Sequence, residues 1–271
     1  MNWSKLETLH GELILYHMIT GSPTDFLNFI QVNKKFKYLL ERLRLNPIPL
    51  TKETKKLFPN ISHQQIFGDK NGEELEGQVR KEGIKVLMFN YEMSYSEYLE
   101  EQEEAQEEGI EIKCRKVVYT EKDRKKFGSI IPNEINILGS WCFSKSDMTS
   151  IIIPTTITEI QCHCFSNCKR LQEIILPDTV VSIGNNCFEY CSSLTQIQLS
   201  TILNCLNRSL FSRCSSLEQI IIPENVTFID NEAFKDCNQL KELIIENDLH
   251  PWNIFSPRIQ SSFSIMSSFN C

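Results

Sequence analysis

One stretch of the sequence decides the fold: LQEIILPDTVVSIGNNCFEYCSSL, which runs from Leu171 to Leu194 and has its phenylalanine at Phe188. The same pattern of residue types returns on both sides of it, at intervals of 22 or 23 residues. Three of the recurring columns are Phe143, Phe165, Phe188, Phe211 and Phe234; Cys168, Cys191, Cys214 and Cys237; and Leu171, Leu194, Leu217 and Leu240. Several columns held in one register predict an internal repeat, which we follow over residues 130–249 as about five copies.

Each part of the repeat predicts a local structure. The segment that reads Leu-x-x-Ile-x-Ile is typical of a short β-strand whose inward residues are two apart. Proline follows it at Pro154, Pro177 and Pro223, and proline ends a strand because it cannot donate to the ladder. A later column holds Gly139 and Gly184, where we expect a turn that needs positive φ. One coil cannot bury its own phenylalanine. We therefore expect stacked coils, a solenoid with a parallel sheet on one side and irregular or short helical turns on the other.

The repeat also separates core residues from those that face solvent. The phenylalanine and cysteine columns are predicted to be structural core, with the cysteines acting as small hydrophobic residues. Because side chains alternate along a strand, the residue between the two inward positions points outward. These outward residues are Ile152, Ile175, Gln198, Ile221 and Ile244. They form a candidate partner-binding stripe with a polar column beside it. The alternatives are that isoleucine merely favours strands, or that the N-terminal region covers this face.

The repeat resembles the BspA-like, or Treponema-type, subfamily of leucine-rich repeats over residues 130–249. The resemblance implies a leucine-rich-repeat solenoid that acts as a binding module. Upstream of the repeats, Val117–Ile135 resembles the intracellular protist members of the family, such as those of Entamoeba. Bacterial surface relatives are adhesins with secretion signals. The apolar run at the start of this chain is interrupted by Glu7, His10, Glu12 and His17, so neither a signal peptide nor an adhesin function is expected here.

Residues 1–60 are predicted to be helical. Apolar residues between positions 6 and 45 follow a spacing of three and four, and Ser22-Pro23-Thr24-Asp25 is typical of a helix start. Within this segment Val32, Lys34 and Phe36 resemble the later part of an F-box. That resemblance implies a substrate adaptor of a ubiquitin ligase, whose helices hold a Skp1-like protein. The alternative is a helical cap that precedes the solenoid.

Residues 61–129 are interpreted as a connecting region. Scattered apolar residues between 46 and 85 favour one or two short helices. Lys85–Phe89 and Ile110–Tyr119 favour strands that begin the sheet of the solenoid and shield its first edge. Between them, Glu97–Glu111 contains eight glutamates, which is typical of a solvated helix or loop; an acidic docking site is the alternative. The predicted fold class is therefore α+β: a small helical region followed by a leucine-rich-repeat solenoid with a short-stranded parallel sheet.

Composition narrows the classes of partner. The net charge of −7 argues against nucleic acid and anionic membranes, since both need clustered lysine and arginine. No apolar run reaches the length of about 18 residues that a membrane span needs. We expect a cytoplasmic location, with the nucleus as the alternative, in which the 11 cysteines are reduced thiols.

One motif has the residue types of a metal site. A zinc site needs four converging ligands, which Cys162, His163, Cys164 and Cys168 could supply. The repeat register separates them, because Cys164 and Cys168 fall in inward columns and the other two in outward, polar columns. No metal, cofactor or catalytic residue is therefore predicted. The chain is interpreted as a non-enzymatic module that binds a protein partner through the solenoid, with the F-box-like adaptor as the alternative.

Residues 250–271 leave the repeat register, because Trp252 falls in the isoleucine column but Pro257 falls where the phenylalanine belongs. We expect Leu249–Phe255 to fold over the last coil as a partial cap and the serine-rich end to be loose, since a terminal coil has no neighbour to cover its apolar face. Limited proteolysis is expected to trim the chain from about Arg258 onward first. Early cleavage within Leu240–Phe255 would contradict the cap.

Overall fold

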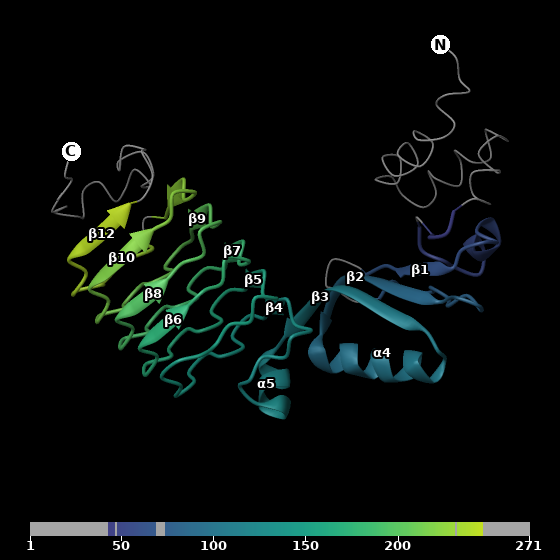
Figure 1. Ribbon diagram of the computed structural model, residues 1–271, viewed down its shortest axis with the longest axis horizontal. Helices are drawn as coiled ribbons and strands as arrows, with labels where there is room; N and C mark the ends of the chain where they lie inside the picture. Colours follow the sequence, from purple (N-terminus) through teal and green to yellow (C-terminus); the bar gives the residue numbers. More distant parts are fainter. Residues whose placement is uncertain (1–42, 47, 69–73, 231, 246–271) are drawn as a thin grey trace, which may run out of the picture. The chain divides into compact units, whose positions relative to one another are not determined.

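The computed structural model describes residues 43–46, 48–68, 74–230 and 232–245. They fall into two compact units that divide after Lys116, and Figure 1 labels the helices and strands of both. The F-box-like residues Val32, Lys34 and Phe36 lie outside the described residues, as do residues 250–271. The predictions made for these two segments stay predictions.

The first unit contains short parallel strands and one long helix. In chain order its elements are the 3-10 helix η2 (Thr54–Leu57), β1 (His63–Ile66), β2 (Val86–Ser94), α4 (Tyr95–Glu107) and β3 (Glu111–Tyr119), whose last residues belong to the second unit. β1 pairs with β2 in parallel over its whole length. Buried apolar side chains, among them Leu50, Phe58 and Phe89, form the core of this unit.

Most of the acidic run Glu97–Glu111 forms helix α4. Ser94 is the N-cap residue, and its hydroxyl accepts a hydrogen bond from the backbone N–H of Glu97. The Glu97 carboxylate in turn accepts the Ser94 N–H at 2.8 Å, so both groups satisfy donors that the helix start leaves unpaired. Ala105 is the buried residue of this helix and most of its glutamates are exposed, which agrees with a solvated helix.

The expectation of one or two short helices between residues 46 and 85 is met by the 3-10 helix η2, but strand β1 is an additional element. This stretch contains the 3-10 helix η2 and then an extended segment, His63–Ile66, whose side chains alternate between half-buried and buried. The hydrophobic pattern hides the strand because one inward position is polar. Gln64 is buried, and its amide donates to the Val79 carbonyl at 2.9 Å and accepts the Lys81 N–H at 2.8 Å. A buried amide that is paired in this way is tolerated in a core.

The second unit is a stack of coils, and four of the described coils contribute a strand to one face. The strands on this face pair in parallel: β6 (Glu173–Ile175) with β8 (Gln196–Gln198), and β10 (Gln219–Ile222) with β12 (Glu242–Ile245). They come from the Leu-x-x-Ile-x-Ile segments and stand next to one another in Figure 1. We call this surface the β6–β12 face.

On the other side of the coils the expected turns occur around each phenylalanine, and extended segments occur as well. Strands of two residues form a second parallel ladder there: β4 (Ile137–Leu138), β5 (Glu159–Ile160) and β7 (Ser182–Ile183) in one run, and β9 (Cys205–Leu206) with β11 (Phe228–Ile229) in another. The last residue of each of these strands is a buried aliphatic, and in β4 the first residue, Ile137, is buried as well. Helix α5 (Glu121–Phe127) precedes the first coil.

The phenylalanine column forms the centre of the stack. Phe143, Phe165, Phe188, Phe211 and Phe234 are buried, and successive ring centroids lie 5.4, 5.4, 5.6 and 5.5 Å apart. The interplanar angles are 10, 0, 8 and 14°, so the rings are nearly parallel. Each inner ring is covered by the rings of the coils before and after it. The stack therefore couples every coil to its neighbours.

The glycine column does not adopt the positive φ expected of it. Among non-glycine residues, positive φ occurs two positions before or after a phenylalanine: at Trp141, Lys145, His163, Asn167, Asn186, Tyr190, Ser209, Arg213 and Asp236. Gly184 is needed for space instead, because a Cβ atom there would lie 2.4 Å from the backbone nitrogen of Cys162. The residue at position 184 must be small because two coils approach each other closely there.

Replacement of Phe188 by alanine is expected to lower the free energy of unfolding by about 3–5 kcal/mol, because it opens a cavity between two stacked rings. Urea unfolding followed by circular dichroism measures this loss. The matched control is Phe228→Ala, which removes the same atoms from a residue that is 45% exposed and is expected to cost far less. Equal losses in the two variants would contradict the stack.

Candidate functional site

The strands of the β6–β12 face turn every second side chain to solvent. In β10, Ile220 and Ile222 are buried, whereas Gln219 and Ile221 are exposed, as the alternation of a strand requires. β6 shows the same alternation around the buried Ile174. The strand register therefore places one isoleucine of each pair in the core and the other on the surface.

Five outward residues make up what we call the isoleucine stripe: Ile152, Ile175, Gln198, Ile221 and Ile244. The four isoleucines are 88, 62, 45 and 39% exposed in this order, and Gln198 is exposed as well. Cross-strand pairing joins Ile152 to Ile175, Ile175 to Gln198, and Ile221 to Ile244. These pairings align the residues of the stripe across the coils.

The ladder of backbone hydrogen bonds is interrupted within the stripe. β8 pairs with β6, and β10 with β12, but in the described part of the chain no strand pairing joins β8 to β10. The coil of β8 has Ser200 where its neighbours have Pro177 and Pro223. The Ser200 hydroxyl is buried and has no hydrogen-bond partner among the described residues. The stripe therefore has two hydrogen-bonded halves that meet at Gln198.

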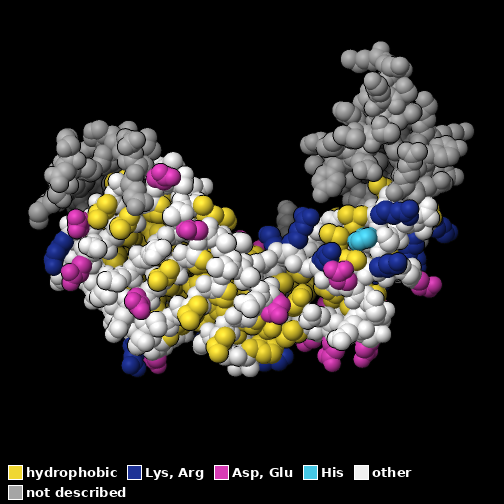
Figure 2. Space-filling view, in the orientation of Figure 1, with side chains coloured by type: hydrophobic (Ala, Val, Ile, Leu, Met, Phe, Trp, Pro, Cys, Tyr) yellow, Lys and Arg dark blue, Asp and Glu magenta, His cyan; other side chains and the backbone are white. Residues whose placement is uncertain are grey.

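Polar and acidic residues border the stripe. The neighbouring outward column consists of Ser150, Glu173, Gln196, Gln219 and Glu242, all of them exposed. Asp178 follows the carboxyl end of β6 and accepts hydrogen bonds from the backbone N–H and the hydroxyl of Thr201, both at 2.9 Å. These bonds lower the pKa of Asp178, so its carboxylate is charged at neutral pH. In Figure 2, hydrophobic side chains form a band over this unit, with acidic side chains beside it.

The cysteine column makes a ladder of its own inside the stack. The thiol of each cysteine donates to the carbonyl oxygen of the phenylalanine in the preceding coil. The pairs are Cys168 with Phe143, Cys191 with Phe165, Cys214 with Phe188 and Cys237 with Phe211, at Sγ···O distances of 3.0, 3.2, 3.1 and 3.0 Å. The Phe165 carbonyl also accepts the backbone N–H of Cys168 at 3.2 Å. Hydrophobic patterning indicates that these cysteines are buried, but it does not reveal that they are donors.

The Cys162–His163–Cys164 motif is not assembled as a metal site. Cys164 is buried, whereas the His163 ring stacks on Trp141 with the centroids 3.9 Å apart. In the part of the chain that the structure describes, no group of three Cys, His, Asp or Glu residues is placed to hold a metal ion. Burial raises the pKa of the Cys164 thiol well above its usual value, so the thiol stays protonated.

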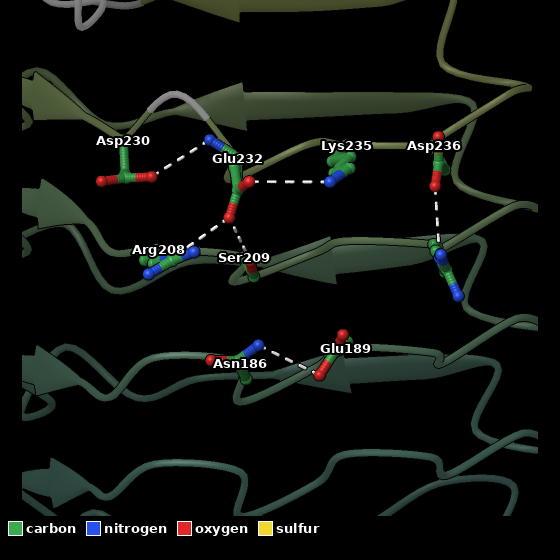
Figure 3. A network of polar contacts seen from close by, with 9 residues as sticks. Asn186, Glu189, Arg208, Ser209, Asp230, Glu232, Lys235 and Asp236 are labelled. Carbon is green, nitrogen blue, oxygen red and sulfur yellow. Dashed lines mark hydrogen bonds and ion pairs between the residues drawn. The ribbon is translucent and has the colours of Figure 1, made fainter.

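A network of charged residues lies at the turns that flank the phenylalanines, and hydrophobic patterning does not reveal it. Arg208 Nε lies 2.9 Å from the Glu232 carboxylate, and Lys235 Nζ approaches the same group at 3.6 Å (Figure 3). The Arg208 guanidinium lowers the pKa of Glu232. Arg213 and Asp236 form a similar pair at 3.2 Å. The signal for such pairs is opposite charge one repeat apart. Exposed ion pairs contribute little to stability, so we assign this network to the positioning of the turns.

Comparison with known proteins finds a family that is similar to the repeats. Residues 129–254 match the family described as BspA type leucine rich repeat region, in six copies. This part of the chain is similar to BspA-type leucine-rich-repeat regions. The six copies are one more than the five positions of the phenylalanine column. None of the curated proteins matches the chain. In the described part of the chain, no helix is both long and apolar enough to cross a membrane.

Solved structures that the repeat protein resembles come from bacteria. A leucine-rich repeat protein from Bacteroides ovatus is 21% identical, with a TM-score of 0.39, over 68% of this chain and 37% of that one. The T. pallidum leucine rich repeat protein is 27% identical, with a TM-score of 0.40, over 47% and 56%. A leucine-rich repeat protein from Eubacterium ventriosum is 17% identical, with a TM-score of 0.41, over 69% and 50%. The chain thus spans 37–56% of the length of these three structures.

Alkaline pH is expected to destabilise the repeat region through its buried thiols. Burial raises the pKa of Cys142 and of Cys237 to about 12, and that of Cys214 well above its usual value. An unfolded thiol has a pKa of about 8.5, so the folded state holds its protons more tightly. The stabilisation is fully present below about pH 8.5 and is lost as pH rises towards the folded pKa, by about 1.4 kcal/mol per pH unit for each thiol.

Urea unfolding at about pH 8 and about pH 10 measures this slope. Cys214→Ala is the matched variant, because it removes one of these protons from the folded state. We expect a shallower loss of stability between the two pH values in this variant than in the parent protein. The same loss in both proteins would show that the thiol of Cys214 is not held protonated by burial.

Proposed function

We propose that the protein is a non-enzymatic interaction module that holds a protein partner on the isoleucine stripe. Leucine-rich-repeat regions serve protein interaction in general, and the match over residues 129–254 supports that role here. The stripe adds a specific surface, an apolar centre with a polar border, which is common in interfaces between proteins.

A comparison of two neighbouring columns supports binding over mere strand propensity. The isoleucine stripe and the polar column from Ser150 to Glu242 lie on the same strands and face the same solvent. If strand propensity alone selected isoleucine, β-branched residues would be favoured in both columns. Isoleucine occupies four of five positions in the stripe and none of five in the polar column. This difference between the columns is the observation that carries the proposal.

The finer points of the proposal concern the partner and the location. The excess of acidic residues, with a net charge of −7, favours a protein partner over nucleic acid or an anionic membrane. We place the protein in the cytoplasm because its many cysteines suit a reducing compartment. An F-box-like adaptor that holds a Skp1-like protein would use Val32, Lys34 and Phe36. Those residues lie outside the described part of the chain, so this alternative stays a prediction.

Site-specific photo-crosslinking tests the proposal on the full chain in extracts of the source cell. A photoreactive amino acid at Gln198, in the middle of the stripe, is expected to form one dominant adduct with a partner, which mass spectrometry identifies. The same amino acid at the exposed Asn204, on the coils' other side, is expected to give none. Equal adducts from both positions, or none from Gln198, would overturn the role of the stripe.

A pair of double variants separates binding from folding. Ile175→Ser with Ile221→Ser is expected to abolish the Gln198 adduct and to leave thermal stability near that of the parent, since both residues are exposed. The matched control is Val181→Ser with Phe228→Ser, which removes two side chains of similar exposure from the other side of the coils. The control is expected to keep the adduct. Unfolding of the first double variant would show that the two isoleucines support the core.

A further inference from the structure

The spacing of the isoleucine stripe discriminates between possible partner segments. Hydrogen-bonded strands lie about 4.8 Å apart, and the coils are 5.4–5.6 Å apart at the phenylalanine rings. One turn of an α-helix rises about 5.4 Å, so a helix laid along the stripe places one side chain on each rung. In an extended segment, the side chains on one face recur about every 6.7 Å. Over the five positions of the stripe, such a segment would be out of register with the coils by about one coil spacing.

The charged groups around the stripe define the border of the partner. Within the strands of the β6–β12 face and directly after them, the charged residues described are Glu173, Asp178, Glu224 and Glu242, all carboxylates. The nearest base in the coil of β12, Lys241, is already paired with Glu218 at 3.9 Å. Opposite charges on the two sides of an interface steer association and fix its orientation. The complementary partner surface therefore carries lysine or arginine on both sides of its apolar row.

On these two grounds, and resting on the proposed function, we propose that the partner presents a basic amphipathic α-helix that lies along the isoleucine stripe. One apolar residue of each turn contacts one isoleucine, and basic residues beside that row face the carboxylates. This is the helix-in-groove mode of recognition, applied to the outward side of a parallel sheet.

Gln198 determines the register of the partner helix along the isoleucine stripe. Its amide carries both donors and an acceptor, and a buried amide that meets an apolar residue would lose its hydrogen bonds to water. The third of the about five turns that cover the stripe therefore carries a polar side chain. The partner helix reads apolar, apolar, polar, apolar, apolar along the row. This order distinguishes it from an amphipathic helix with an unbroken apolar row.

A designed peptide tests the inference with the full chain. The probe is a fluorescent helical peptide of about 18 residues, about five turns, with leucine in the row, glutamine in the third turn and lysine on both borders. Fluorescence anisotropy measures its dissociation constant. One control peptide has the same composition with the leucines distributed around the helix, and a second has glutamate in place of every lysine. We expect both controls to bind at least about tenfold more weakly than the probe.

Three double variants of the protein locate the binding. Ile175→Ser with Ile221→Ser is expected to weaken the lysine peptide by about tenfold or more, whereas Val181→Ser with Phe228→Ser leaves its affinity unchanged. Glu173→Lys with Glu242→Lys is expected to remove the preference for the lysine peptide over the glutamate peptide, because two of the four border carboxylates become cationic. Preserved preference for lysine in this charge-reversed protein would overturn the acidic border as the determinant.

The outcomes separate this inference from the proposed function. If the probe fails to bind, or binds no better than the peptide with distributed leucines, the helical partner is wrong. If the Gln198 position still forms a single adduct in that case, the proposed function stands and its partner uses another structure. If the probe fails and Gln198 forms no adduct, both the inference and the proposed function are wrong.

Discussion

The stacking of one phenylalanine on the next is the interaction on which the repeat region depends. A single coil is too thin to enclose its ring, so the core exists only between coils. The ring spacing of 5.4–5.6 Å lies close to the spacing of hydrogen-bonded strands, and aromatic stacking and strand pairing therefore reinforce each other. The thiol of Cys214 follows the same period when it reaches the Phe188 carbonyl of the coil before. Aromatic, backbone and thiol contacts all recur from one coil to the next.

Because the core contacts involve only the inward residues, part of each coil is free for function. The inward positions are assigned to the core by volume, and the close approach at Gly184 admits no side chain. The turns are held by local geometry and by pairs such as Arg208 with Glu232. The outward columns of the β6–β12 face carry no such duty. The residue types in these outward columns can therefore reflect partner recognition, and they differ sharply between the isoleucine stripe and the polar column beside it.

The period of the sequence predicts the strands of the β6–β12 face and the side on which each isoleucine lies, because alternation and repeat length together leave one register. Other features follow from contacts that no pattern of hydrophobicity encodes. Strand β1 has a polar inward residue, Gln64, whose partners are backbone groups distant in sequence. The strands of the second ladder are two residues long, which is too short for the alternation of inward and outward residues to be recognised in the sequence. The small size of Gly184 reflects a neighbouring coil rather than its own φ. Residues 1–42 lie outside the described chain, so the structure adds nothing to the helical and F-box-like predictions.

The interruption between β8 and β10 has a mechanical consequence. In a continuous parallel sheet, a change of curvature strains every hydrogen bond along the ladder. Here the sheet is divided into two parts, β6 with β8 and β10 with β12, but the coils of β8 and β10 are still joined on their other side by the pairing of β9 with β11. The phenylalanine rings also span the division, with Phe188 and Phe211 centroids 5.6 Å apart, so the two coils are held together in the core as well as on their other side. The outward face is therefore the side on which hydrogen bonds between strands contribute least to the spacing of these two coils.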